Sequence, residues 1–122
     1  MKSMIMVGIG GFLGSIGRYY TQILFNKIFN NPFPLGTMTA NVVGCFIIGI
    51  IFALGLRQGS LSNEWKLFLA VGFCGGYTTF SSFSLENLNL VQSGHYMLAI
   101  FYTLASVMLG FGATLLAIII FR

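Results

Sequence analysis

The centre of the third apolar segment reads Gly72-Phe73-Cys74-Gly75-Gly76-Tyr77-Thr78-Thr79. Each glycine costs about 1 kcal/mol relative to alanine inside a helix, and the two threonines add β-branched side chains that helices disfavour. The sequence therefore predicts a helix over 63–91 that is broken at 72–79. Within a membrane, irregular backbone persists only where protein buries it or where it lines a polar pathway. Because broken helices in transporters place free carbonyl groups at ion sites, we expect an ion near this segment.

The composition places the chain in a membrane. Of its 122 residues, 57% are hydrophobic and 7% are charged, whereas a soluble domain carries about 25% charged residues. Six basic and two acidic residues cannot cover a soluble globule, so we exclude a soluble enzyme and a disordered tail. The basic residues form no patch or stripe, which excludes a nucleic-acid-binding protein.

The residues that most enzymes and metal sites use are scarce. Cys45 and Cys74 lie in apolar segments and form no CxxC motif, and the single histidine, His95, lies in a predicted loop. We interpret both cysteines as structural thiols. The sequence therefore predicts neither a catalytic triad nor a zinc site.

Four apolar segments are long enough to cross a bilayer. They predict helices at 4–28, 37–56, 63–91 and 96–121, and so an all-α integral membrane protein with a single transmembrane domain over 1–122. The first segment is too long for the apolar region of a signal peptide and contains Arg18, so we expect a retained helix. Its Gly10 and Gly14 have the GxxxG spacing that lets two helices approach closely. Arg57-Gln58-Gly59-Ser60 is predicted to form a polar turn after the second helix.

The charges specify the orientation in the membrane only weakly. One side of the predicted bundle carries Lys2, Arg57, Lys66 and Arg122, and the other carries Lys27 and Arg18. This bias is slight by the positive-inside rule. The chain is therefore compatible with insertion in both orientations, which permits an antiparallel dimer.

Several polar side chains interrupt the apolar segments. Besides Arg18, Asn41 and Glu86, they are the hydroxyl residues Thr79, Ser81, Ser82, Ser84, Tyr102 and Ser106. Such residues usually face the bundle interior or a pathway. For any single serine or threonine, a bond to a neighbouring helix or to its own helix backbone is the simpler explanation. Asn41 is harder to explain in this way, because its amide needs up to four hydrogen-bond partners.

Two aromatic residues follow the predicted break. Phe80 and Phe83 are three residues apart and so share a helix face. Ordinary packing is the simpler explanation of this spacing, because the chain contains 13 phenylalanines.

Three motifs resemble those of the Fluc (CrcB) fluoride channel family. The most specific is Gly75-Gly76-Tyr77-Thr78-Thr79-Phe80-Ser81-Ser82-Phe83-Ser84, followed by Glu86. The second is Pro34-Leu35-Gly36-Thr37 with Asn41 and Gly44, and the third is Gly10-Gly11-Phe12-Leu13-Gly14 with Arg18-Tyr19. The resemblance covers nearly the whole chain in the order of the family.

The resemblance implies an antiparallel, dual-topology homodimer with two parallel fluoride pores. A structural Na⁺ ion would lie at the dimer centre, held by backbone carbonyls that match Gly75 and Thr78 in each subunit. Carbonyl oxygens are hard ligands that suit such a cation. The fluoride pathway matches Asn41, Phe80, Phe83, Tyr102, Ser106, Ser81 and Ser84. The positive ring edges of the two phenylalanines would face the anion.

The ends of the implied pathway are less regular. Arg18 matches a basic residue near a vestibule, and Glu86 matches an acid near the pore end. The hydroxyl track on the fourth helix departs from the family at Gly110, which has no hydroxyl, and Thr114 is the next candidate along that helix.

The implied function is passive export of cytoplasmic fluoride across a bacterial inner membrane, which confers fluoride resistance. One alternative is a small four-helix multidrug-type transporter, which would require an acidic residue in the first apolar segment, where the chain has none. Another is an assembly subunit without transport of its own. This alternative explains the glycines but neither Asn41 nor the broken third helix.

Overall fold

The computed structural model describes residues 1–57, 59 and 61–122, and within these ranges every regular element is a helix. Gln58 and Ser60, in the predicted polar turn, lie outside the described residues. The first two helices are α1 (Lys2–Ile28) and α2 (Leu35–Leu56). The third crossing consists of α3 (Asn63–Lys66), the π-helical η1 (Leu67–Cys74), α4 (Gly75–Tyr77) and α5 (Phe80–Gln92). The chain ends with α6 (Tyr96–Phe121).

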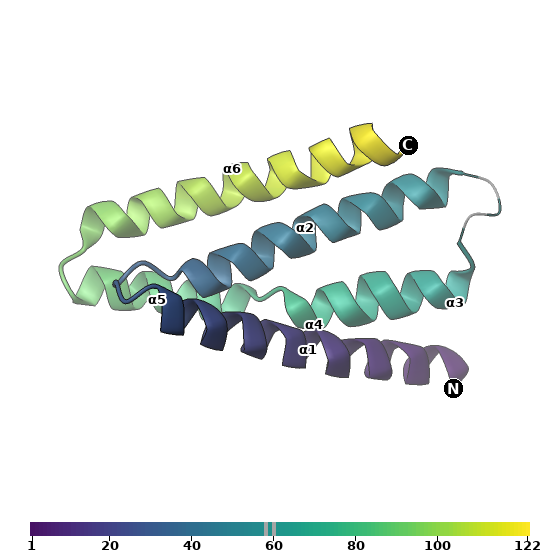
Figure 1. The fold of residues 1–122 in the computed structure, drawn as a ribbon, viewed down its shortest axis with the longest axis horizontal. Coiled ribbons are helices and arrows are strands. Elements are labelled where there is room, and N and C mark those ends of the chain that lie inside the picture. The colour runs from purple at the N-terminus through teal and green to yellow at the C-terminus, as the bar shows by residue number, and fades with distance from the viewer. Residues whose placement is uncertain (58, 60) are drawn as a thin grey trace.

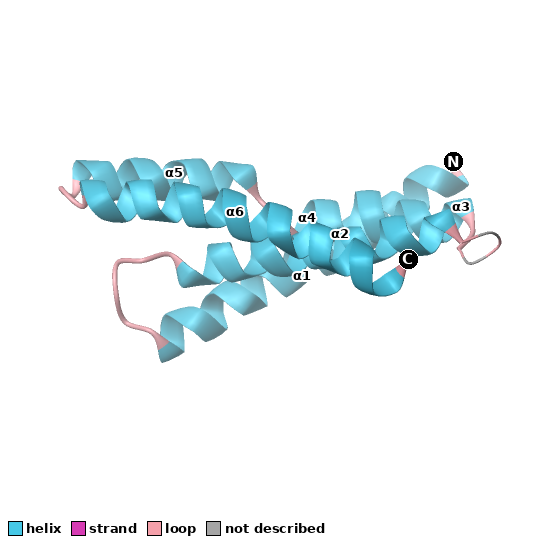
Figure 2. Ribbon diagram, turned by 90° about the horizontal axis from the view of Figure 1, so that it is seen from above, coloured by secondary structure: helices cyan, strands magenta, loops and turns pink. Residues whose placement is uncertain are grey.

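The helices lie side by side, and both chain termini and α3 lie at the same end of the bundle (Figure 1). The most extensive contacts pair α2 with α6 and α1 with η1. At the opposite end, the α5–α6 pair diverges from the pair made by α1 and the start of α2 (Figure 2). A cavity of about 300 Å³ lies between these two pairs, lined by residues that include Gln22, Thr37 and Glu86.

The interruption of the third crossing is narrower than the glycines suggest. Gly72, Gly75 and Gly76 all lie in helical segments, and only two residues are extended. These are Thr78 (φ −86°, ψ 157°) and Thr79 (φ −152°, ψ 122°). The backbone leaves the helix at the two β-branched residues, which helices disfavour and extended backbone accommodates.

The glycines instead allow the first and third crossings to meet backbone to backbone. A Cβ atom on Gly10 would overlap the Phe68 carbonyl oxygen, and one on Gly14 would overlap the Phe73 carbonyl oxygen. A Cβ on Gly76 would lie 2.5 Å from the Gly11 carbonyl oxygen. Such close approach maximises dispersion contacts where lipid provides no hydrophobic driving force. This packing offsets the helix cost of the glycines.

The outer surface is apolar, as expected for a membrane protein. Exposed large side chains include Phe12 and Ile16 on α1 and Met108 and Phe111 on α6. Two helices, Leu35–Leu56 and Tyr96–Phe121, are long and apolar enough on their own to cross a bilayer. The third crossing is divided into pieces shorter than a span, and α1 carries three charged residues, Lys2, Arg18 and Lys27.

Replacing Gly14 by alanine tests the backbone contact between α1 and η1. We expect Gly14→Ala to lower the free energy of unfolding by ~1–3 kcal/mol, because overpacking forces the two backbones apart. The measurement is thermal unfolding of the purified protein in detergent. Gly8→Ala is the matched control on the same helix, since a Cβ there would meet no atom within 4 Å. Equal unfolding temperatures for the two variants would contradict the proposed contact.

Candidate functional site

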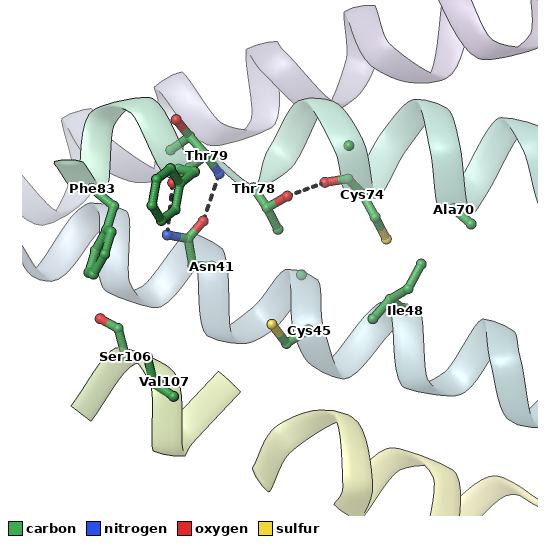
Figure 3. A pocket seen from close by; sticks show the side chains of 13 residues that line it. Asn41, Cys45, Ile48, Ala70, Cys74, Thr78, Thr79, Phe83, Ser106 and Val107 are labelled. Carbon is green, nitrogen blue, oxygen red and sulfur yellow. Dashed lines mark hydrogen bonds between the residues drawn. The ribbon is translucent and has the colours of Figure 1, made fainter. Parts of the chain in front are cut away.

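The break in the third crossing is held by Asn41 from α2. Its Oδ1 accepts a hydrogen bond from the Thr79 N–H at 2.7 Å, and its Nδ2 donates to the Thr79 carbonyl oxygen at 3.1 Å (Figure 3). Both polar groups of this extended residue are therefore satisfied by one side chain. Gly44, one turn along α2, lies so close to Thr78 that a Cβ would overlap the threonine methyl group. The missing side chain at Gly44 brings α2 within reach of the break.

Other side chains satisfy further backbone groups at the break. The Arg18 Nε donates to the Gly76 carbonyl oxygen at 3.2 Å. The N–H and Oγ1 of Thr78 both donate to the Cys74 carbonyl oxygen, at 3.0 and 2.8 Å. The Thr79 Oγ1 caps α5 by accepting from the Ser82 N–H at 3.1 Å. The break is thus bonded from α1, from α2 and from within the third crossing.

These bonds divert the usual donors from two carbonyl groups. In a continuous helix, the Gly75 carbonyl would accept from the Thr79 N–H and the Thr78 carbonyl from the Ser82 N–H. Here the Thr79 N–H bonds Asn41, and the Ser82 N–H bonds the Thr79 side chain. Carbonyl oxygens without a helical donor are the ligands that a small hard cation takes. The backbone at Gly75 and Thr78 therefore fits the Na⁺ ion that the family resemblance implies.

A cavity of about 450 Å³ adjoins the break. Its lining includes Gly75 and Thr78 together with Asn41, Phe80, Phe83 and Ser106 (Figure 3). The Phe80 and Phe83 ring centroids are 5.7 Å apart, and Phe80 is 79% exposed. The Ser106 Oγ is buried and has no hydrogen-bond partner among the described residues. The structure thus gathers four of the predicted pathway residues beside the two predicted carbonyl ligands.

The two cysteines also line this cavity, which the sequence did not reveal. Both are free thiols, and Cys74 is buried. The Cys45 sulfur lies 3.3 Å from where a Cβ on Gly110 would be, so this glycine accommodates the thiol. The Thr114 Oγ1 donates to the Cys45 carbonyl oxygen at 2.9 Å. In this structure Thr114 therefore ties α6 to α2.

Glu86 forms a second polar centre, closer to the end opposite the termini. Its carboxylate accepts from the Thr37 hydroxyl at 2.7 Å and from the Tyr102 hydroxyl at 2.9 Å. The Gln22 Nε2 in turn donates to the Thr37 Oγ1 at 3.0 Å. This network joins all four crossings, and Tyr102 and Thr37 are almost fully buried. The Tyr102 hydroxyl is therefore bonded to Glu86, away from the cavity that Ser106 lines.

The remaining predicted residues lie near the break without lining the same cavity. Ser84 lines an adjacent cavity of about 480 Å³, which Phe80 and Phe83 also line. The Ser81 hydroxyl is exposed and lies 3.2 Å from the Thr79 Oγ1. Arg18 reaches the break from α1, through its hydrogen bond to the Gly76 carbonyl oxygen. Within the described residues the only ion pair joins Lys2 and Glu64, so neither Arg18 nor Glu86 has a charged partner there.

Sequence reasoning missed Gln22 and Thr37. Gln22 lies four residues after Arg18 and so on the same face of the first helix. Thr37 closes the Pro34-Leu35-Gly36-Thr37 motif, and that motif predicts no partner for its hydroxyl. Polar residues at helix ends often bond their own backbone, so neither pattern singled out a bond to Glu86.

The family model described as "CrcB-like protein, Camphor Resistance (CrcB)" matches residues 5–118. The chain belongs to the CrcB family. The resemblance predicted from its three motifs is therefore confirmed. Relatives of similar sequence carry the name "Fluoride-specific ion channel FluC". One, from Azobacteroides pseudotrichonymphae, is 43% identical over 120 residues, which is 98% of this chain and 96% of the relative.

Two further relatives with the same name give similar values. The protein from Leptospira interrogans is 44% identical over 111 residues, covering 91% of this chain and 87% of the relative. The protein from Flavobacterium psychrophilum is 43% identical over 120 residues, covering 98% of this chain and 97% of the relative. The similarity therefore extends over every helix of the CrcB fold described above.

Removing the Asn41 amide tests its role at the break. We expect Asn41→Ala to lower the free energy of unfolding by ~1–3 kcal/mol, because Thr79 keeps two polar backbone groups with no partner. Thermal unfolding in detergent provides the measurement. Asn89 is the control, because its side chain is exposed on α5 and bonds no described residue. Should Asn41→Ala unfold at the temperature of Asn89→Ala, the bridge to Thr79 contributes nothing.

Proposed function

We propose that this protein is a channel for passive fluoride export from the bacterial cytoplasm. The proposal rests on one arrangement in a chain of the CrcB family: Asn41, Phe80, Phe83 and Ser106 line one cavity beside the interrupted helix. The names of the relatives indicate fluoride as the ion, and the residues that line the cavity are donors that suit it. The protein would act as a multi-pass protein of the inner membrane, without catalysis.

The donors are suited to an anion that has lost its water. Transfer of an ion into a low-dielectric site costs of order 20 kcal/mol in the idealised Born limit, so close donors must replace the hydration shell. Asn41 uses one amide hydrogen on the Thr79 carbonyl, and its second remains for an anion. The unpartnered Ser106 hydroxyl and the positive edges of Phe80 and Phe83 complete the set. Fluoride, the smallest halide, gains most from such close donors.

We propose that the working unit is an antiparallel, dual-topology homodimer with a structural Na⁺ ion. Each chain provides the carbonyl oxygens of Gly75 and Thr78. Two oxygen ligands are too few to coordinate a cation. A second copy would supply two more. In support, the space around Gly75 is open, with no atom within 4 Å of an added Cβ, and Phe80 stands exposed beside it. The bound ion would supply a fixed positive charge near the anion pathway.

Arg18 and Glu86 would act away from the anion-lining cavity. The Arg18 guanidinium has no acidic partner among the described residues, so its charge attracts anions toward the break. Glu86 ties the four crossings together and thereby fixes the start of α5, which carries both phenylalanines. An inside-negative membrane potential drives an anion outward by about 2.3 kcal/mol per charge per 100 mV. No coupling ion is needed.

Fluoride efflux from liposomes tests the function. Purified protein is reconstituted in fluoride-loaded liposomes, and a fluoride electrode records release after a potassium ionophore removes the charge build-up. We expect rapid fluoride release and retention of chloride in matched liposomes. Retention of fluoride under the same conditions would exclude the channel.

Phe80→Ile and Phe83→Ile test the aromatic donors within the same assay. We expect each variant to release fluoride at least tenfold more slowly, because an aliphatic side chain has no positive edge, which corresponds to about 1.4 kcal/mol or more of lost stabilisation. Phe111→Ile is the matched control, because Phe111 is 77% exposed on α6 and lines none of the cavities described. Wild-type rates for both variants would exclude a role of the rings in conduction.

A further inference from the structure

The hydrogen bonds at the break determine which carbonyl groups remain open. The break follows Tyr77, so helical hydrogen bonds are lost around it. The carbonyl groups concerned are those of Cys74, Gly75, Gly76 and Thr78. Cys74 keeps its donors from Thr78, and Gly76 receives the Arg18 guanidinium. The Gly75 and Thr78 carbonyls lose their helical donors to side chains of Asn41 and Thr79.

We propose that Thr79 and Arg18 are positioning residues for the Na⁺ site, an inference that rests on the sodium-bound dimer proposed above. The Thr79 Oγ1 accepts a hydrogen bond from the Ser82 N–H, so the Thr78 carbonyl does not receive that bond. Arg18 holds the Gly76 carbonyl toward α1 and so separates it from its neighbours. Neither residue contacts the ion. Both determine which oxygens face it.

The competition at Thr79 is local and direct. Without the Thr79 hydroxyl, the Ser82 N–H has no acceptor at the start of α5. The nearest helical acceptor is the Thr78 carbonyl, four residues earlier, and a bond to it would extend α5 backward by one residue. The same oxygen would then be occupied by an N–H in place of the cation. The Thr79 N-cap thus keeps a cation ligand free and also defines the start of α5.

Arg18 acts on the opposite side of the break. Gly76 packs against the backbone of α1, so its carbonyl lies within reach of a residue seven positions after Gly11 on that helix. The guanidinium Nε satisfies the carbonyl with a charge-assisted hydrogen bond. Without this bond, the Gly76 carbonyl and the short α4 segment would no longer be held in one orientation. The carbonyl of Gly75, in the same turn, would lose its fixed direction.

Sodium-dependent thermal stability tests the proposal without measuring fluoride. Purified protein is unfolded across a series of NaCl concentrations, with N-methylglucamine chloride keeping the ionic strength constant. A ligand that binds only the folded state raises the unfolding temperature with concentration, which gives its apparent affinity. For Thr79→Val we expect the apparent Na⁺ dissociation constant to rise roughly tenfold, the change that corresponds to one hydrogen bond of about 1.4 kcal/mol. Thr79→Ser keeps the hydroxyl and should match the wild type.

Arg18→Gln provides the second variant, which keeps the proposal testable if Thr79→Val does not fold. It should also raise the apparent Na⁺ dissociation constant, and high NaCl concentrations should restore part of its stability. Arg57→Gln is the control, because the Arg57 side chain donates to the Arg122 carbonyl oxygen at the terminal end of the bundle, far from the break.

Unchanged or lower Na⁺ requirements in Thr79→Val or Arg18→Gln would overturn the proposal. A lower requirement in Arg18→Gln would mean that the guanidinium mainly repels the cation. A wild-type protein that does not respond to Na⁺ would also overturn it, together with the sodium site itself. The fluoride efflux assay tests the channel separately, so the failures are distinguishable.

Discussion

The structure depends on one constraint: a polar backbone group inside a membrane must have a partner. Interrupting the third crossing at Thr78 and Thr79 removes helical hydrogen bonds at a depth where water does not replace them. Asn41 provides a donor and an acceptor for Thr79, Arg18 provides a donor for Gly76, and the Thr79 hydroxyl caps the following helix. The break is therefore stable only because α1 and α2 place polar side chains beside it.

The same constraint links the fold to its function. The glycine contacts between α1 and the third crossing bring Arg18 to the break, and Gly44 brings α2 and Asn41 to its other side. The side chains that satisfy the break leave the carbonyls of Gly75 and Thr78 without helical donors. The cavity that adjoins these carbonyls contains Asn41, Phe80, Phe83 and Ser106. One irregular dipeptide thus accounts for both the proposed cation site and the proposed anion-lining surface of the channel.

Much of this arrangement follows from the sequence, because hydropathy and motif residues are local signals. The four apolar segments predict the helices to within a few residues, and the threonines lie at the observed break. The glycines lead to a predicted break that is longer than the observed one. They pack against α1, which is distant in sequence, so a local pattern does not reveal this role. Likewise, the residues around Glu86 come from all four crossings, so no spacing could reveal that Tyr102 bonds this carboxylate. Tertiary partners, which a local pattern does not contain, decide where a polar side chain points.

The most direct test of the central claim is solid-state NMR of Thr78 and Thr79 in lipid bilayers. Backbone chemical shifts distinguish extended from helical residues, and amide exchange reports hydrogen bonding. The account predicts extended shifts at both threonines, with a Thr79 amide that exchanges slowly in the wild type and rapidly in Asn41→Ala. Helical shifts at both positions, with a Thr79 amide unaffected by the Asn41 substitution, would contradict it.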